Sequence, residues 1–454
     1  MKSNLQLLWI FSCIFSIGIF NLSAQGGETL TFKYFDVIEK DSTVVKIVPK
    51  KVTVLPLWAE CVNQNKWSWR GNPQNSDTPY FEGPIPYMLP PLESSFEPFY
   101  SHNHQPSLTW LENGDLMAIW FSTNKESGTE MTVLASRLRA GKDVWDPSSE
   151  FYKAPNRNMT GSSLFNDGKG NLYHFNSLGF ENQDGWADLA VLLRISHDNG
   201  VSWTTPKAIA PKIKGRHQVI DGTVLTSEGY FIQPCDAHWS MSGGTALMIS
   251  KDGGVSWEDP GEGKKIPSYL DGGVGNGTIA GIHGGVVELK NGNLMALGRS
   301  DNINGYMPLS ISKDLGKTWR YSPSPFPPIG GGQRLVLTRL KEGPILLVSF
   351  THHPQEDDGG MMFKDKDDTE FKGKGLFAAL SYDEGKTWPV KKLITPGAGT
   401  FNGGGWTGDF TATLQQAEPR GYLSATQTPD NIIHLISSRL HYRFNLKWLE
   451  STSE

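Results

Sequence analysis

The sequence has little cysteine, little net charge and no long apolar run beyond its N-terminus. Three cysteines occur in 454 residues, and one of them, Cys13, lies within the N-terminal apolar run. The remaining pair, Cys61 and Cys235, is too sparse to form a disulfide framework, although an oxidising compartment would permit a bridge between them. A formal charge of -5 argues against nucleic acid or an anionic membrane surface as a partner. The charge leaves open an anionic sugar, which a local cluster of arginine or histidine could bind.

The first 24 residues have the features of a secretory signal peptide. Lys2 supplies the positive start, residues 7–20 form a mostly apolar run, and the small residues Ser23 and Ala24 offer a cleavage site. A run of about fourteen residues is too short for a comfortable membrane span. We therefore expect a mature protein that is secreted or periplasmic, not inserted in a membrane, and monomeric.

An octet of the form Ser-x-Asp-x-Gly-x-(Ser/Thr)-Trp occurs four times. The copies occupy residues 196–203, 250–257, 312–319 and 381–388, about 60 residues apart. Asp and Ser side chains can accept hydrogen bonds from nearby main-chain amides, glycine permits a positive φ, and tryptophan supplies a large apolar plate. The octet therefore predicts a self-bonded turn with an apolar anchor. The alternative, a calcium loop, lacks an acidic residue at the closing position.

A second pattern repeats with the octets: a polar turn between two short apolar strands, followed by a third strand that leads into the octet. These turns lie at residues 112–115, 167–170, 227–229, 290–292, 341–343 and 428–431. Degenerate third strands around Ser136 and Ser438 extend the series at both ends and give six units. Sheets of about four strands at this period predict an all-β, six-bladed β-propeller over residues 101–454. The last unit lacks an outer strand, and we expect the N-terminal segment, residues 25–100, to close the ring with residues 29–49 as the donor.

These octets resemble the Asp boxes, or BNR repeats, of the sialidase superfamily. The resemblance covers residues 101–449 and implies an active site near the propeller axis, on the face opposite the Asp boxes. It also implies three arginines for the substrate carboxylate, an aspartate acid/base and a Tyr–Glu nucleophile pair. A His-Gln-Pro tripeptide beginning at His104 stands where the family has an Arg-Ile-Pro-like tripeptide. In the loop that carries the family's acid/base, Glu130 fits the position best and Glu126 comes next.

Polar residues gather where the first strand of each blade would begin, next to the axis. The candidate substrate-binding residues are His104, His217, His283, Arg334, Arg439 and Asp236. The histidines could bind sugar hydroxyls or titrate near neutral pH. Arg334 enters an inner strand and needs an anionic partner, which could be a substrate carboxylate or sulfate, or a protein carboxylate such as Asp409. Any one of these residues, taken alone, could equally be an ordinary polar loop residue that binds no ligand.

Glycoside hydrolysis needs a proton donor for the leaving oxygen and a second group on the other side of the sugar. The predicted donor is Glu130, with Glu126 as substitute. The opposing group is Asp221 or Tyr442, although Tyr442 could instead be a packed aromatic. The sequence thus favours an exported, sialidase-like exo-glycosidase that acts on a complex acidic glycan without a metal or other cofactor. Two alternatives stay open: a lyase that cleaves a uronic-acid polymer with a histidine base and a tyrosine acid, and a glycan-binding propeller without catalysis.

Overall fold

The computed structural model describes residues 19–23, 29–40, 45–53, 55–69, 78–95, 97–185, 189–210, 216–237, 243–262, 269–355 and 359–452. Strands dominate this part of the chain. Apart from the 3-10 turns η1 (Leu57–Ala59) and η2 (Glu93–Ser95) and the short helix α1 (Leu446–Glu450), its named elements are all β-strands. Most of the expected signal peptide lies outside the described residues. No helix within the described ranges is long and apolar enough to cross a membrane.

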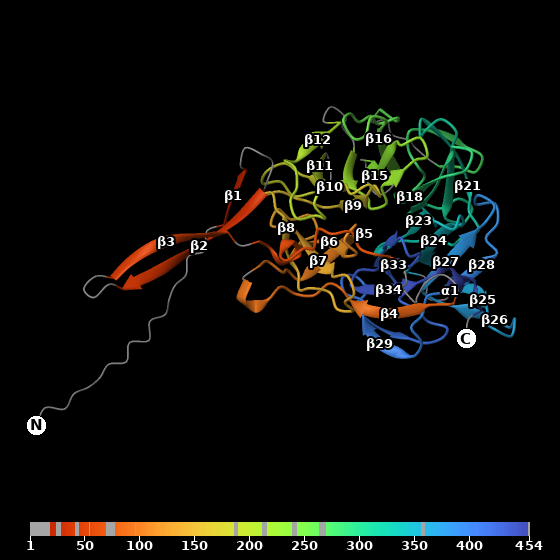
Figure 1. Cartoon of the computed structure of the whole chain (residues 1–454). Coiled ribbons are helices and arrows are strands. Elements are labelled where there is room, and N and C mark those ends of the chain that lie inside the picture. Colours follow the sequence, from red (N-terminus) through yellow and green to blue (C-terminus); the bar gives the residue numbers. More distant parts are fainter. Residues whose placement is uncertain are drawn as a thin grey trace, which may run out of the picture.

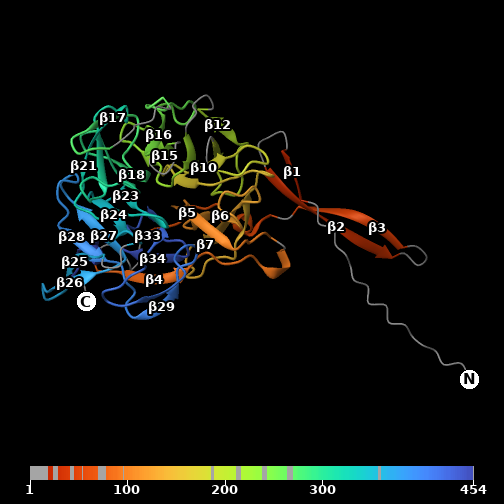
Figure 2. The same cartoon turned by 180° about the vertical axis from the view of Figure 1, so that it is seen from behind.

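Six antiparallel sheets follow one another around a ring, as the sequence colours in Figures 1 and 2 show. Blades 1 to 3 contain β5 (His102–Trp110), β6 (Leu116–Thr123), β7 (Thr132–Leu138) and β8 (Ser149–Tyr152); β9 (Ser162–Asn166), β10 (Leu172–Leu178), β11 (Ala190–Ser196) and β12 (Lys207–Ile209); and β13 (Arg216–Val219), β14 (Val224–Leu225), β15 (Phe231–Ala237) and β16 (Thr245–Ser250). Blades 4 to 6 contain β18 (Ile282–Glu288), β19 (Leu294–Arg299), β20 (Pro308–Ser312) and β21 (Thr318–Pro323), with β17 (Val274–Asn276) added outside; β23 (Val336–Arg339), β24 (Ile345–Phe350), β27 (Leu376–Ser381) and β28 (Val390–Leu393); and β32 (Ser424–Gln427), β33 (Ile433–Ile436), β34 (Leu440–Phe444) and β4 (Phe81–Pro86). The predicted six-bladed β-propeller is confirmed.

Smaller paired strands lie between these blades. Two hairpins are formed by β25 (Met361–Lys364) with β26 (Glu370–Gly373) and by β29 (Gly399–Asn402) with β30 (Asp409–Ala412). Near the axis, β22 (Gln333–Arg334) and β31 (Gly421–Tyr422) pair in parallel. The last of these pairs brings the inner edges of blades 5 and 6 together, and it positions part of the site described below.

The middle strands are buried because each blade packs face to face with its neighbours. Every residue of β6, β7, β16, β24 and β27 is buried. The octet tryptophans take part in this packing. Trp319 of blade 4, for example, is fully buried in a cluster that includes Leu247 and Ile249 of blade 3. The octet therefore joins neighbouring blades as well as closing a turn.

The octets have the self-bonded geometry that their sequence predicts. In the third copy, Asp314 Oδ1 accepts from Thr318 N at 2.8 Å, and Oδ2 accepts from Thr318 Oγ1 at 2.6 Å. Ser312 Oγ accepts from Gly316 N at 2.8 Å, and Gly316 has φ +81°. Trp319 Nε1 donates back to Gly316 O at 3.1 Å. The aspartate is thus occupied by its own loop, which leaves it a structural role.

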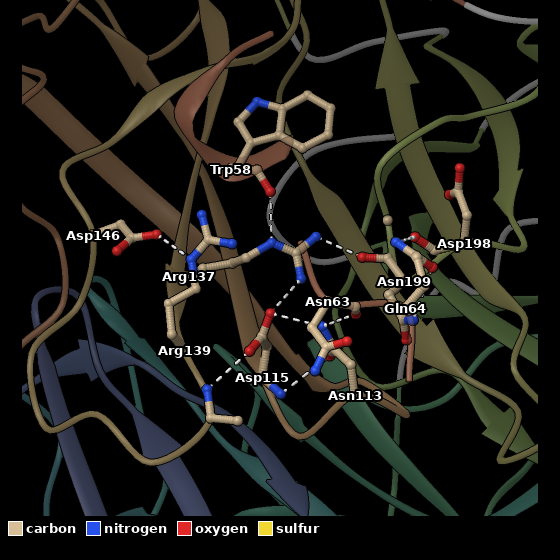
Figure 3. Close-up of polar contacts among 12 residues, drawn as sticks. Trp58, Asn63, Gln64, Asn113, Asp115, Arg137, Arg139, Asp146, Asp198 and Asn199 are labelled. Atoms are coloured by element: carbon tan, nitrogen blue, oxygen red, sulfur yellow. Dashed lines mark hydrogen bonds and ion pairs between the residues drawn. The ribbon is translucent and has the colours of Figure 1, made fainter. Parts of the chain in front are cut away.

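A buried arginine takes the place of a complete octet in blade 1 (Figure 3). Arg137 of β7 donates to the main-chain oxygens of Trp58 and Asn199 and forms an ion pair with Asp115, with 3.1 Å between Nη1 and Oδ2. Burial lowers the pKa of Arg137 to about 10 and Asp115 opposes this change, so the guanidinium stays cationic at neutral pH. A buried cation is tolerated when an anion and several acceptors surround it. The Arg137 guanidinium therefore contacts the N-terminal segment through Trp58, blade 1 through Asp115, and the first octet through Asn199.

The N-terminal segment closes the ring, as predicted, but the donor strand differs from the predicted one. β4 pairs antiparallel with β34 and supplies the outer strand of blade 6, and in Figure 1 the orange β4 lies beside the blue β34. Residues 29–49 instead lie in β2 (Thr29–Lys40) and β3 (Val45–Thr53), which pair with each other and with β1 (Ile19–Ser23). The prediction of residues 29–49 as donor was therefore wrong. The physical reason is side-chain fit: Phe81 stacks on Trp448 at 4.4 Å, and Glu82 forms an ion pair with Arg443.

Replacement of Phe81 by alanine should weaken this closure. Phe81 is partly buried, so its loss should lower the free energy of unfolding by about 2 kcal/mol. Denaturant unfolding monitored by tryptophan fluorescence would measure the change. The matched control is Phe180→Ala, because Phe180 is exposed. Equal unfolding free energies for the two variants would contradict a stabilising role for β4.

Candidate active site

The inner strands become irregular at the level where they converge on the axis. β5 has a bulge between His104 and Ser107, with Gln105 at φ +52°, and β18 has one between Ile282 and Gly285, with His283 at φ +50°. Bulges re-aim side chains and are common next to active sites, and a positive φ is costly for a residue with a side chain. The bulges in β5 and β18 thus turn polar residues of two opposed blades toward the same part of the central channel.

Tyr422 lies at the centre of this space. Its ring centroid is 3.9 Å from that of His104 and 5.2 Å from that of His283. Its hydroxyl oxygen accepts from Arg299 Nη1 at 2.7 Å and lies 3.2 Å from His283 Nε2. Burial raises the pKa of Tyr422, and the positive charge of Arg299 opposes the rise. The phenol is therefore neutral at rest but next to a group that would stabilise its anion.

Asp236 and His283 form a relay that ends on the Tyr422 hydroxyl. The main-chain amide of His283 donates to Asp236 Oδ1 at 2.8 Å, and the second carboxylate oxygen lies 3.3 Å from His283 Nδ1. Gln218 Nε2 donates to the same oxygen at 2.7 Å. Burial raises the pKa of Asp236 to about 6, so it is ionised at neutral pH. A proton on Nδ1 facing this carboxylate leaves the lone pair of Nε2 toward Tyr422, as a general base requires.

Many of the buried polar atoms without a hydrogen-bond partner in the described residues lie around this relay. They are His102 Nε2, His104 Nδ1 and Nε2, Gln105 Oε1, Arg299 Nε, Asp301 Oδ2 and Arg420 Nε. Burial lowers the pKa of His104 well below its ordinary value, and the neighbouring cations add to this effect, so the imidazole is neutral. Buried polar groups in native proteins normally have partners. Their concentration here indicates a site where a ligand supplies them.

The two candidate proton donors lie in the same loop of blade 1 but in different surroundings. Partial burial raises the pKa of Glu130, but hydrogen bonds outweigh it and lower the pKa to about 2. The donors are Thr123 Oγ1 at 2.6 Å and the amides of Asn124 and Lys125 at 2.8 and 3.1 Å. Glu130 is therefore a loop anchor that stays ionised, which argues against it as the proton donor. Glu126 differs: burial raises its pKa, with Arg299 opposing.

Arg334 and Asp221 lie in the channel beneath His104. Arg334 donates to the main-chain oxygens of Leu423 and Pro106, and its guanidinium carbon lies 5.3 Å from the Tyr422 ring centroid. Burial raises the pKa of Asp221, and Arg334 is the main opposing influence. Asp221 is thus the carboxylate whose negative charge stabilises the Arg334 cation most, rather than Asp409. These two residues support the site from within the protein.

Tyr442 occupies a different place from the predicted one. It is fully buried in the hydrophobic core that blades 5 and 6 share, and its hydroxyl donates to Glu418 Oε2 at 2.9 Å. The packed-aromatic interpretation fits this position, and the nucleophile interpretation does not, because Tyr442 does not reach the cluster around Tyr422. Arg439 does lie at the mouth of the channel, where its Nη1 donates to Asn402 Oδ1 at 3.0 Å. The main chain of His217 lies in β13, but its side chain is outside the described part of the structure.

Neither Cys61 nor Cys235 takes part in a disulfide within the described residues. Cys61 is exposed near η1, and Cys235 is buried in β15. The bridge that an oxidising compartment would permit is therefore not present in this structure.

Comparison with known proteins agrees with this architecture. A profile described as a BNR repeat-like domain matches residues 114–435. The chain belongs to this BNR repeat-like family. It is a divergent member of the sialidase superfamily, which confirms the resemblance of the octets to Asp boxes. The six-bladed fold is the one expected of the superfamily.

Individual relatives of this BNR repeat-like protein are distant. A sialidase from Paraclostridium sordellii is 23% identical over 56% of this chain and 63% of its own length, so the chain spans less than two thirds of that relative. Among solved structures, a Hadza microbial sialidase has a TM-score of 0.51 at 16% identity, covering 76% of this chain and 66% of its own. A protein of unknown function from Dyadobacter fermentans has a TM-score of 0.52 at 15% identity, covering 80% and 98%. These structures show the shared fold.

Sequence reasoning missed Tyr422, although the signal was present. The rule that selected His104 and His283 was their position at the start of an inner strand of a BNR blade. Gly421-Tyr422 occupies the same position in blade 6, directly before β32. Tyr442 was the candidate instead, as the nucleophile that the family resemblance implies, but it lies in β34, whose residues are all buried. Gln218 donates to Asp236 but carries no charge, and the candidate site residues were chosen mainly among charged and titratable side chains.

The buried pair of Glu418 and Tyr442 should make stability depend on pH. Burial raises the pKa of Glu418 from 4.5 to about 8, so between these values the folded chain holds a proton that the unfolded chain releases. The free energy of unfolding should fall with rising pH in that window, by about 1.4 kcal/mol per pH unit at most. Glu418→Gln keeps an acceptor for Tyr442 and should remove this slope. Unfolding at several pH values measures it, with the exposed Glu370→Gln as control, and an unchanged slope in Glu418→Gln would refute the assignment.

Proposed function

We propose that this protein is an exported glycoside hydrolase that releases a terminal residue from an acidic glycan. The observation that carries the proposal is the Tyr422–His283–Asp236 relay, in which the Tyr422 hydroxyl lies 3.2 Å from His283 Nε2, and Glu126 is the candidate acid that completes it. Glu126 has a raised pKa, as a proton donor needs, and it interacts electrostatically with both Arg299 and Tyr422. A carboxylic acid and a base-activated hydroxyl at one site are the two groups that glycoside hydrolysis requires. Export is proposed from the signal-like residues 1–24.

In this mechanism Glu126 gives its proton to the leaving glycosidic oxygen. The Tyr422 oxygen attacks the anomeric carbon while His283 Nε2 takes the phenol proton, and Asp236 stabilises the resulting imidazolium. Arg299 donates to the same oxygen and stabilises the anionic character that develops on it. Water then attacks the glycosyl–tyrosine bond, with the Glu126 carboxylate accepting the water proton. Tyr422 is reprotonated from His283, which returns all groups to their starting state.

The cations at the channel mouth support an acidic substrate. Among the described residues, Arg299 and Arg420 each have a buried Nε without a partner, and Arg439 donates to Asn402 at the mouth of the channel. Guanidinium groups bind carboxylates and sulfates with paired hydrogen bonds. His104 is neutral and offers hydrogen bonds to hydroxyls, where the superfamily has an arginine. The known sialidases among the relatives are consistent with a carboxylated terminal sugar, while His104 favours a substrate other than a common sialoside.

Glu126→Gln should lower kcat/KM about 10²- to 10⁴-fold on a substrate with a poor leaving group. Because the acid must be protonated, the kcat/KM of the wild-type protein should fall as pH rises through the Glu126 pKa. The residual activity of the variant should not show this fall.

The matched control is Glu130→Gln in the same loop, which should keep both the wild-type rate and the wild-type dependence of kcat/KM on pH. The substrate would come from a screen of sialosides, uronides and sulfated glycans. A normal rate in Glu126→Gln with a large loss in Glu130→Gln would reverse the assignment.

A lyase acting on a uronic-acid polymer is a second candidate, favoured by one contact. His283 Nε2 and the Tyr422 hydroxyl lie 3.2 Å apart, and a histidine base with a tyrosine acid could carry out β-elimination. This reaction would need no carboxylic acid, so it leaves the raised pKa of Glu126 without a role.

The two reactions give different products. We expect hydrolysis to release a reducing sugar without new absorbance at the ultraviolet edge, whereas a lyase would form an unsaturated uronide that absorbs there. Turnover that absorbs there and survives Glu126→Gln would establish the lyase. Binding without any turnover, unaffected by Tyr422→Phe, would indicate a glycan-binding propeller.

A further inference from the structure

Two neighbouring hollows lie on the Asp-box face, opposite the channel mouth. They have volumes of about 400 Å³ and about 490 Å³ and lie between the N-terminal segment and the turns of blades 1 and 6. Small-molecule sites commonly have volumes of roughly 300–1,000 Å³. Trp67, Arg139 and Ala140 line both hollows. The turns around Asp115 and Asn199 in Figure 3 belong to the same face.

Trp67 is held on this surface by a specific fit. Its main-chain amide donates to Glu112 O at 2.8 Å, and Lys66 forms an ion pair with the Glu112 carboxylate at 3.3 Å. A Cβ atom on Gly114 would lie 2.5 Å from Trp67 Cγ, so the indole packs directly on this glycine. The side of the indole away from Gly114 stays open, since Trp67 is 43% exposed. An exposed tryptophan that is rigidly positioned is a surface that can bind the apolar face of a ring.

The first hollow also contains a donor whose direction is determined by a buried chain of hydrogen bonds. Trp145 Nε1 donates to His441 Nδ1 at 3.2 Å, so the His441 proton is on Nε2 and faces His434 Nδ1 at 3.1 Å. Burial lowers the pKa of His434 to about 3, so this ring is neutral and its own proton is on Nε2. That N–H is the polar group that His434 offers to the hollow it lines.

Arg443 provides a second, independent indication of a ligand. Its side chain lines the hollow and is nine-tenths buried, yet its Nε has no hydrogen-bond partner among the residues that the structure describes. Its terminal nitrogens are used by Glu82 and Asp143. Lys142 adds an exposed ammonium, and Asp143 and Asp430 add acceptors. Positive and negative groups nearly balance, which does not suit a strongly anionic ligand such as a nucleic acid.

We propose that this face is a second saccharide-binding site, in which Trp67 stacks on a sugar ring. The nearby donors and acceptors would bind the hydroxyls, each of which can both donate and accept. The inference rests on the proposed function only for the class of ligand. A site behind the channel would retain the protein on a long glycan while the channel acts on a chain end.

The test separates the two faces by using a channel-inactive protein. Full-length Glu126→Gln would be applied to an array of sialosides, uronides, sulfated oligosaccharides and neutral oligosaccharides, and affinities would be measured by calorimetry. Trp67→Ala should weaken binding about tenfold or more, which corresponds to about 1.4 kcal/mol. Lys142→Ala, which changes an exposed side chain and cannot disturb packing, should weaken it a few-fold. The matched control is Trp406→Ala, because Trp406 is 50% exposed but lies beside His102 on the channel face.

Each outcome decides the proposal. Binding that depends on Trp67 and Lys142 but persists in Trp406→Ala supports it, and a thermal melt confirms that the variants are folded. Binding that is lost in Trp406→Ala and retained in Trp67→Ala would overturn it, because only the channel would then bind sugar. Absence of binding to every array member by folded protein would overturn it too. If the wild-type protein turns over none of the screened glycans but binds one through Trp67, the proposed hydrolase fails and the second site stands.

Discussion

The convergence of six inner strands on one axis is the constraint on which the structure depends. A ring of sheets is stable only if its last blade is completed, and β4 does this by pairing with β34. Once the ring is closed, the inner strands approach one another and cannot all remain regular. The bulges in β5 and β18 and the parallel pair of β22 with β31 are the result. The same irregularities turn polar side chains into the channel, so closure and the candidate site have one cause.

Burial of charge inside this ring is tolerated through pairing. Arg137 is paired with Asp115 on the Asp-box side, and Arg334 is accompanied by Asp221 in the channel. Removing one member of such a pair would leave an uncompensated charge, which is more costly than the pair itself. At the channel mouth the pattern changes, because His104, Arg299 and Arg420 have buried atoms that find no partner in the described part of the chain. The contrast between satisfied pairs and unsatisfied groups separates the parts that hold the ring from those that would contact substrate.

Much of the fold could be predicted because its signals are local. The hydrogen bonds of each octet join residues of the same octet, as between Asp314 and Thr318, so its geometry can be predicted from the local sequence. The choice between β4 and residues 29–49 as the closing strand was not local: it depended on the fit of Phe81 against Trp448, more than 300 residues away. The same limit applies to Glu126 and Glu130. Both are acidic residues in one loop, and only the surrounding amides show that Glu130 is held ionised.

The sequence alone determined the number of blades and the self-bonded geometry of the octets. Tertiary structure decided which polar residues meet. Tyr422, His283, Asp236 and Arg299 come from three different blades, and their contacts exist only because the closed ring brings strands from distant parts of the chain within a few ångströms. Turn geometry is set by neighbours in the chain, whereas a catalytic constellation is set by neighbours in space.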